Sequence, residues 1–135
     1  MKGLFVDTAG WMACADAADP SHAQACAARD LWLEQQGRLV TTDYVADETL
    51  TLLRLRIGLK AAEAWWRQAD GSLRLRWEWI TPARAEKARA IFFRYQDKEF
   101  SLTDCTSFVV MRELKLREVL TTDRHFAQFG FAMKP

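Results

Sequence analysis

Short apolar runs alternate with longer helical stretches along the chain, and this alternation constrains the fold more than any other feature of the sequence. The strand-like runs lie at residues 2–6, 38–42, 73–80, 117–121 and 130–133. The helical stretches lie at residues 20–36, 43–57, 59–69, 81–98, 102–115 and 124–128. Such an order is typical of an α/β fold in which helices flank a parallel sheet. We therefore expect an α/β fold of this kind.

Two of the strand-like runs differ in the burial that they predict. Residues 3–6 are apolar or small throughout, which suits a central strand whose two faces are both covered. In residues 73–80, apolar side chains at odd positions alternate with charged side chains at even positions as far as Trp79. One face of this strand is therefore expected to be wet, which predicts a place at the edge of the sheet.

The length and charge of the chain set the scale of the molecule. A chain of 135 residues, half of them hydrophobic, can bury a core without disulfides, so we expect a single domain over residues 1–135. Its 19 basic and 18 acidic residues nearly cancel. A polyanionic partner would therefore have to be held by a local basic patch, because the net field of the protein is weak.

Cysteine usage and hydropathy indicate the compartment. The three cysteines, Cys14, Cys26 and Cys105, have no CxxC spacing and lie among small or apolar residues, which favours reduced and mostly buried thiols. The apolar run at the amino terminus is interrupted by Asp7, and no run approaches the ~20 residues of a membrane helix. We expect a cytoplasmic protein that does not associate with membranes.

Three acidic residues are predicted to share one edge of the sheet. Asp7 ends the first strand-like run and Asp123 ends the fourth, and ligands of open α/β sheets bind at the carboxyl ends of strands. From Asp104, a helix of about 12 residues rises roughly 18 Å. The next extended segment returns by a similar length, and right-handed crossovers keep the strand ends on one rim. Asp104 is thus expected near the other two.

A fourth acid, Glu48, has an unusual position in its helix. Tyr44, Val45 and Leu52 lie three or four positions away from Glu48, so the carboxylate shares the apolar face of this helix. Aromatic and aliphatic residues likewise follow Asp104 four and seven positions later. Burying either carboxylate without a partner would be costly.

A divalent cation would resolve this clustering of negative charge. Without one, the acids would repel one another, and some of them would take up protons. All four candidate ligands are carboxylates, which favours Mg²⁺ or Mn²⁺ over zinc or copper. Such an ion can polarise a phosphoryl oxygen and activate water for in-line attack on a phosphodiester. The sequence therefore suggests hydrolysis of a nucleic acid.

Four segments together resemble a known family. They are Val6-Asp7-Thr8, Thr42–Thr49 with Glu48 inside it, Ser101-Leu102-Thr103-Asp104 and Leu120–Phe126 with Asp123 inside it. In order and spacing they resemble the PIN-domain ribonucleases, and more closely the VapC-type toxins of bacterial toxin–antitoxin pairs. The resemblance spans nearly the whole chain and implies a PIN-like fold, with a five-stranded parallel sheet in the order 3-2-1-4-5.

The resemblance also implies a site and an activity. Asp7, Glu48, Asp104 and Asp123 would form a Mg²⁺ or Mn²⁺ site, with hydroxyl support from Thr8 and Thr121. The protein would be a metal-dependent endoribonuclease, the toxin of a type II toxin–antitoxin system, whose products carry 5′-phosphate and 3′-hydroxyl ends.

Paired aromatic residues suggest contacts with other proteins. Trp65-Trp66 and Phe92-Phe93 exceed what one helical stripe can bury, because adjacent residues point about 100° apart. One member of each pair is therefore expected at the surface, where a protein interface is favoured over stacking on bases. In the family that the chain resembles, such surfaces serve a homodimer and the cognate antitoxin protein.

The acids have a simpler interpretation as helix caps. Asp7 and Asp123 could each cap the turn that follows, and residues 101–104 read as a capping box. Capping does not account for Glu48, which lies in the middle of its helix. His125 is interpreted here as a surface or turn residue and is left out of the site.

Two other functional classes remain open at this point. A PIN-like module that binds RNA or protein without catalysis would have the same fold. A receiver-type phosphoacceptor domain also has acids at strand ends, but it typically carries an acidic pair after the first strand, where this chain has the single Asp7.

Overall fold

The computed structural model describes residues 2–135. Its sheet has the order β3-β2-β1-β4-β5, and every neighbouring pair of strands is parallel. The strands are β1 (Gly3–Val6), β2 (Arg38–Thr42), β3 (Leu75–Glu78), β4 (Glu118–Leu120) and β5 (Ala132–Lys134). The expected parallel sheet, its strand order, the central place of the first strand and the edge place of the third are confirmed.

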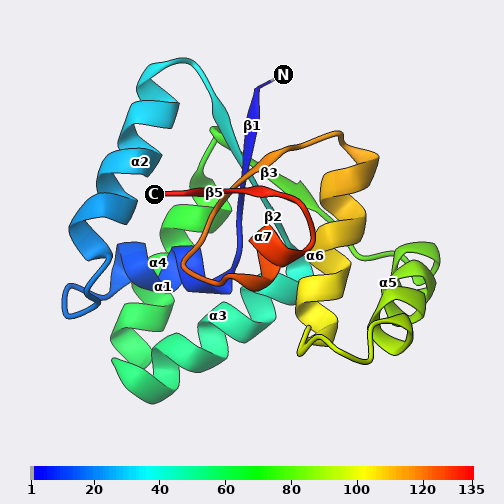
Figure 1. Ribbon diagram of the computed structural model, residues 1–135. Helices are drawn as coiled ribbons and strands as arrows, with labels where there is room; N and C mark the ends of the chain where they lie inside the picture. The colour runs from blue at the N-terminus through cyan, green and yellow to red at the C-terminus, as the bar shows by residue number, and fades with distance from the viewer. Residues whose placement is uncertain (1) are drawn as a thin grey trace.

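The helices flank this sheet. They are α1 (Thr8–Ala15), α2 (His22–Glu34), α3 (Asp43–Arg56), α4 (Leu59–Gly71), α5 (Pro82–Arg94), α6 (Leu102–Glu113) and α7 (His125–Gln128). Figure 1 shows α1, α2 and α4 on one side of the central strands and α5 and α6 on the other, with α3 below the carboxyl end of β1. Helix α3 contacts both α1 and α6. Within residues 2–135, no helix is long and apolar enough to span a membrane.

Helix α1 was not expected from the sequence. Its residues are apolar or small on almost every side and most are buried, so they lack the one-sided periodicity that identifies a helix at a surface. Asp7 caps this helix by accepting a hydrogen bond from the amide of Gly10. A Cβ atom at Gly10 would overlap the carbonyl oxygen of Leu120, so glycine allows α1 to lie directly against β4.

Aromatic side chains join α6 to the segment that follows β4. Phe108 stacks on Phe129, with 4.3 Å between ring centroids, and meets Phe126 edge to face. Phe108 and Phe126 are fully buried, and each such ring stabilises the fold by roughly 1.5–3 kcal/mol. These contacts fix the start of α7 against α6, the two elements that carry His125 and Asp104.

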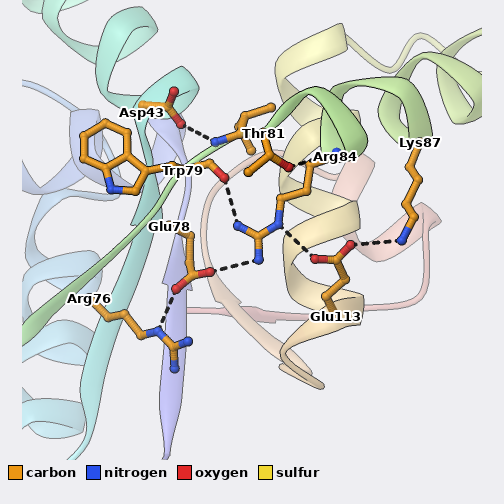
Figure 2. A network of polar contacts seen from close by, with 9 residues as sticks. Asp43, Arg76, Glu78, Trp79, Thr81, Arg84, Lys87 and Glu113 are labelled. Carbon is orange, nitrogen blue, oxygen red and sulfur yellow. Dashed lines mark hydrogen bonds and ion pairs between the residues drawn. The ribbon is translucent and has the colours of Figure 1, made fainter.

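A network of ion pairs attaches α5 to its neighbours (Figure 2). The guanidinium of Arg84 lies 2.9 Å from Glu78 at the end of β3 and 2.9 Å from Glu113 at the end of α6. It also donates to the carbonyl oxygen of Trp79, and Lys87 gives Glu113 a second cation. Because the Arg84 side chain is only 16% exposed, these contacts are less screened than ordinary surface pairs.

Of the two adjacent aromatic pairs, only Trp65-Trp66 has one buried and one exposed member as expected. Trp65 is buried and Trp66 is partly exposed, as predicted. Phe92 and Phe93 are both exposed, because α5 buries the small side chain of Ala88 instead.

The predicted alternation along the third strand is also shorter than expected. Leu75 is buried, but Leu73 and Trp79 lie outside β3 and are largely exposed.

Candidate active site

The four acids that the sequence singled out line one cavity at the carboxyl ends of the central strands. Asp7 follows β1, Glu48 lies on α3, Asp104 on the first turn of α6, and Asp123 follows β4. The cavity has a volume of about 250 Å³. Residues more than 100 positions apart therefore face the same space.

Two of the acids that line this cavity also form a closer group with a histidine. One ligand atom from each of Asp104, Asp123 and His125 lies within 4.8 Å of the other two. Asp7 and Glu48 line the cavity outside this group. His125, interpreted from the sequence as a surface or turn residue and left out of the site, is partly buried, and its ring nitrogen lies 3.0 Å from Asp104 and 3.2 Å from Asp123.

Asp7 is the most deeply buried of the acids. Its Oδ1 accepts a hydrogen bond from the amide of Gly10, and its Oδ2 accepts one from the hydroxyl of Thr121, both at 2.8 Å. Burial, helped by the nearby charges of Asp123 and Asp104, raises the pKa of Asp7 from 3.8 to about 8 in spite of these two bonds. The metal-free site thus favours a proton on Asp7 at neutral pH.

The two threonines named from the family resemblance have different surroundings. The hydroxyl of Thr121 donates to Asp7 and accepts a hydrogen bond from the amide of Asp123. The hydroxyl of Thr8 is buried beside the cavity and has no hydrogen-bond partner among residues 2–135, and the same holds for Ser107. The hydroxyls of Thr8 and Ser107 are thus two buried polar groups of the cavity wall that could bond a ligand.

Asp104 has both of the roles that the sequence offered for it. The hydroxyl of Ser101 accepts a hydrogen bond from the amide of Asp104, and Asp104 Oδ2 accepts one from the amide of Ser101, which completes a capping box. The same carboxylate lines the cavity. Burial and the charge of Asp123 raise the pKa of Asp104, while the contact with His125 opposes this rise.

Two charged residues of the cavity wall were not predicted. Arg56 lies eight residues after Glu48, and the spacing through Leu52 places all three along one face of α3. That spacing could have revealed Arg56 in the sequence. Asp19, in the connection between α1 and α2, also lines the cavity and carries no recognisable pattern of its own. Among residues 2–135, Arg56 is the one lysine or arginine in this wall.

The composition of the wall fits a hard divalent cation. Five carboxylates face a single arginine across a small cavity, and oxygen atoms are the ligands that Mg²⁺ and Mn²⁺ prefer. One arginine does not balance five carboxylates, and the buried hydroxyls of Thr8 and Ser107, which have no partner among residues 2–135, add further oxygen atoms to this wall. The group of Asp104, Asp123 and His125 can hold a metal ion.

The model of one protein family, the PIN domain, matches residues 4–132. The chain belongs to the PIN-domain family. This membership agrees with the resemblance seen in the sequence and sets aside the receiver-domain alternative.

Relatives with a known name are similar over almost the whole chain. The 23S rRNA-specific endonuclease VapC20 of Mycobacterium tuberculosis is 34% identical over 132 residues, which are 95% of this chain and 95% of the relative. Ribonuclease VapC26 of the same species is 32% identical over 127 residues, 92% of this chain and 90% of the relative.

Solved structures agree in fold. The crystal structure of M. tuberculosis VapC20, described as a Sarcin-Ricin loop cleaving toxin, superposes with a TM-score of 0.87 and 33% identity, covering 98% of this chain and 99% of that one. FitAcB from Neisseria gonorrhoeae superposes with a TM-score of 0.70 and 14% identity, covering 98% and 96%. The second likeness concerns the fold alone.

Proposed function

We propose that this PIN-domain protein is an endoribonuclease that depends on Mg²⁺ or Mn²⁺ and acts as the toxin of a type II toxin–antitoxin pair. The observation that carries the proposal is the meeting of Asp7, Glu48, Asp104 and Asp123, from four separate elements, around one small cavity. The names of two relatives more than 30% identical support the same activity.

In this proposal, the four acids have two different roles. Asp7, Asp104 and Asp123 hold the cation, and Glu48, across the cavity on α3, binds a second ion or orients the attacking water. A bound Mg²⁺ or Mn²⁺ supplies Lewis-acid polarisation of the scissile phosphate and lowers the pKa of water. Thr121 holds Asp7 in place through its hydrogen bond, and Thr8 offers a hydroxyl at the cavity wall.

The positively charged wall residue has a role in the same scheme. Arg56 borders the acidic cavity and is exposed to solvent. A guanidinium can hold a phosphate through two parallel hydrogen bonds. We assign to Arg56 the binding of an RNA phosphate at the entrance, which would offset the repulsion between the backbone of the RNA and the acids.

The name of one relative supports a proposal for the substrate. VapC20 is named for cleavage of 23S rRNA, and its structure is described by the Sarcin-Ricin loop, so that hairpin is the substrate that we propose first. We further propose that a cognate antitoxin protein blocks the site and that the toxin forms a homodimer. Exposed aromatic residues such as Trp79 and Phe93 supply surface for such contacts.

Cleavage of a defined RNA tests the proposal. Purified protein, free of any partner, is incubated with a Sarcin-Ricin loop hairpin in Mn²⁺ or in EDTA, and the ends of the products are mapped. Wild type and the control Asp47→Asn, an exposed acid on α3 outside the cavity, should cut only with Mn²⁺ and leave 5′-phosphate and 3′-hydroxyl ends. Asp104→Asn should lose at least 100-fold in rate, as expected when a group that stabilises the transition state is removed.

The other outcomes have definite meanings. RNA that stays intact with wild type and Mn²⁺, across rRNA and total RNA, would favour a PIN-like module that binds without catalysis. Cleavage that survives in EDTA, or that Asp104→Asn leaves unchanged, would contradict a metal-dependent activity at this cavity.

A further inference from the structure

His125 links two acids that come from different parts of the chain. Its Nδ1 atom lies 3.0 Å from Asp104 Oδ2 and 3.2 Å from Asp123 Oδ1. Its backbone amide donates a hydrogen bond to Asp123 Oδ1, at 2.9 Å. One residue therefore holds a carboxylate of α6 and a carboxylate that follows β4 in a common geometry.

The imidazole is itself held in place. It meets the ring of Phe100 nearly at right angles, with 5.6 Å between the centroids, and its side chain is only 27% exposed. The next residue, Phe126, is fully buried and anchors α7 in the core. A ring that is fixed in this way can impose an orientation on its partners, because it has few other positions to adopt.

The bonds of His125 divide the oxygens of each carboxylate into two kinds. Asp104 Oδ2 accepts from the ring of His125 and from the amide of Ser101, while Asp123 Oδ1 accepts from the amide of His125 and lies 3.2 Å from its ring nitrogen. The other oxygens, Asp104 Oδ1 and Asp123 Oδ2, accept no hydrogen bond from residues 2–135. The orienting contacts thus occupy one oxygen of each acid and leave one for a ligand.

We propose that His125 is a positioning residue of the cation site, an inference that rests on the proposed function. Its Nδ1–H bonds one oxygen of Asp104 and lies beside one oxygen of Asp123, which its backbone amide also bonds, so that the remaining oxygens are left to bind the ion. In this proposal the carboxylate oxygens bind the ion and His125 orients them, because Nδ1 is engaged with Asp104 and the ion prefers oxygen ligands.

Replacement of such an outer partner is expected to weaken metal binding. Loss of a residue that orients metal-binding carboxylates typically costs 10- to 100-fold in affinity. In His125→Asn, the side-chain amide nitrogen can take nearly the place of Nδ1 and donate to the same oxygens. In His125→Gln, the amide nitrogen extends toward the position of Nε2, where it cannot make these contacts.

The test measures binding of Mn²⁺, not cleavage of RNA. Free Mn²⁺ is counted by electron paramagnetic resonance during titration of wild type, His125→Asn and His125→Gln, with thermal unfolding in EDTA as a check on folding. We expect the dissociation constant to rise 10- to 100-fold in His125→Gln and only a few-fold in His125→Asn. The metal-free variants should unfold at similar temperatures.

Three results would overturn the proposal. The first is wild-type affinity in His125→Gln, and the second is equal weakening in both variants. The third is a directly coordinated ¹⁴N in the electron spin-echo spectrum of Mn²⁺ bound to wild type, which would make His125 a ligand. A wild type that binds no Mn²⁺ would overturn the proposed function as well, whereas unchanged binding in His125→Gln would remove this inference alone.

Discussion

The hydroxyl of Thr121 donates a hydrogen bond to Asp7 Oδ2 at 2.8 Å and so joins the ends of two adjacent parallel strands, β1 and β4. The same hydroxyl accepts the amide of Asp123. A single buried oxygen therefore sets the relative positions of two proposed cation ligands. The site is organised by a residue that has no negative charge of its own.

Replacement of this threonine by a residue of similar shape should reveal its contribution. Thr121→Val leaves an oxygen of buried Asp7 and the amide of Asp123 without partners, which should lower the free energy of unfolding by ~1–3 kcal/mol. Thr121→Ser keeps the hydroxyl and serves as control. Chemical denaturation in EDTA measures the free energy of unfolding of both variants. A Thr121→Val protein as stable as Thr121→Ser would show that the hydrogen bonds of the Thr121 hydroxyl do not contribute to stability.

The elevated pKa of Asp7 predicts how stability depends on pH. Between its ordinary value of 3.8 and about 8, folded Asp7 keeps a proton that the unfolded chain releases. The contribution of Asp7 to stability is therefore fully present below pH 3.8, falls as the pH rises, and is lost above about pH 8. The slope is at most about 1.4 kcal/mol per pH unit.

The variant Asp7→Asn isolates this effect from the other titrating groups. In EDTA, the difference in unfolding free energy between wild type and Asp7→Asn should shift in favour of the variant as the pH rises from 4 to 8, and should then level off. Mn²⁺ should bind wild type more tightly as the pH rises through the same interval, because the ion competes with the proton. A difference that is flat from pH 4 to 8 would show that Asp7 is already ionised in the metal-free protein.

Arg56 should affect binding of RNA more than chemistry. If it contacts one phosphate, Arg56→Ala should raise KM while kcat changes little, and the salt dependence of RNA binding should fall by about one phosphate contact. Arg54 lies on the same helix, is also exposed and does not line the cavity, so Arg54→Ala is the matched control. Equal effects of the two variants would indicate a general loss of positive charge.

Gly10 should be intolerant of even a methyl group. In Gly10→Ala, the new Cβ would overlap the carbonyl oxygen of Leu120, which belongs to a central strand and cannot move freely. We expect a loss of ~1–3 kcal/mol, typical of overpacking. Gly71 has open space around it, so Gly71→Ala provides the control. A Gly10→Ala protein as stable as this control would mean that α1 can move away from β4.

The parts of the fold that the sequence predicted are those that local patterns encode. Strand positions follow from short apolar runs, and Ser101 caps its helix as its sequence context indicated. Helix α1 was not predicted because a helix that is buried on nearly all sides has no polar face, and its sequence therefore lacks the helical periodicity of hydrophobic and polar residues. The expectation that only one of Phe92 and Phe93 is exposed was wrong, because their exposure depends on what α5 packs against, which no local pattern contains.

The residues of the candidate site that could be named from the sequence are likewise those with a local pattern. Each of the four acids lies at an unusual position, either a strand end or an apolar helix face, and the family resemblance indicated that they form one site. His125 has no such pattern, since its role depends on Asp104, which lies 21 residues away in the sequence. Asp19 reaches the cavity through the loop that follows the unexpected helix α1, so it could not be placed before that helix was known.

If these acids form a binding site for a divalent ion, Mn²⁺ should raise the temperature at which the protein unfolds. At 100 times its dissociation constant, an ion that binds only the folded state stabilises it by about 2.7 kcal/mol. We expect this shift in wild type and in Asp47→Asn, and its loss in Asp104→Asn. No shift in wild type, or an equal shift in all three proteins, would show that these acids do not form a site for the ion.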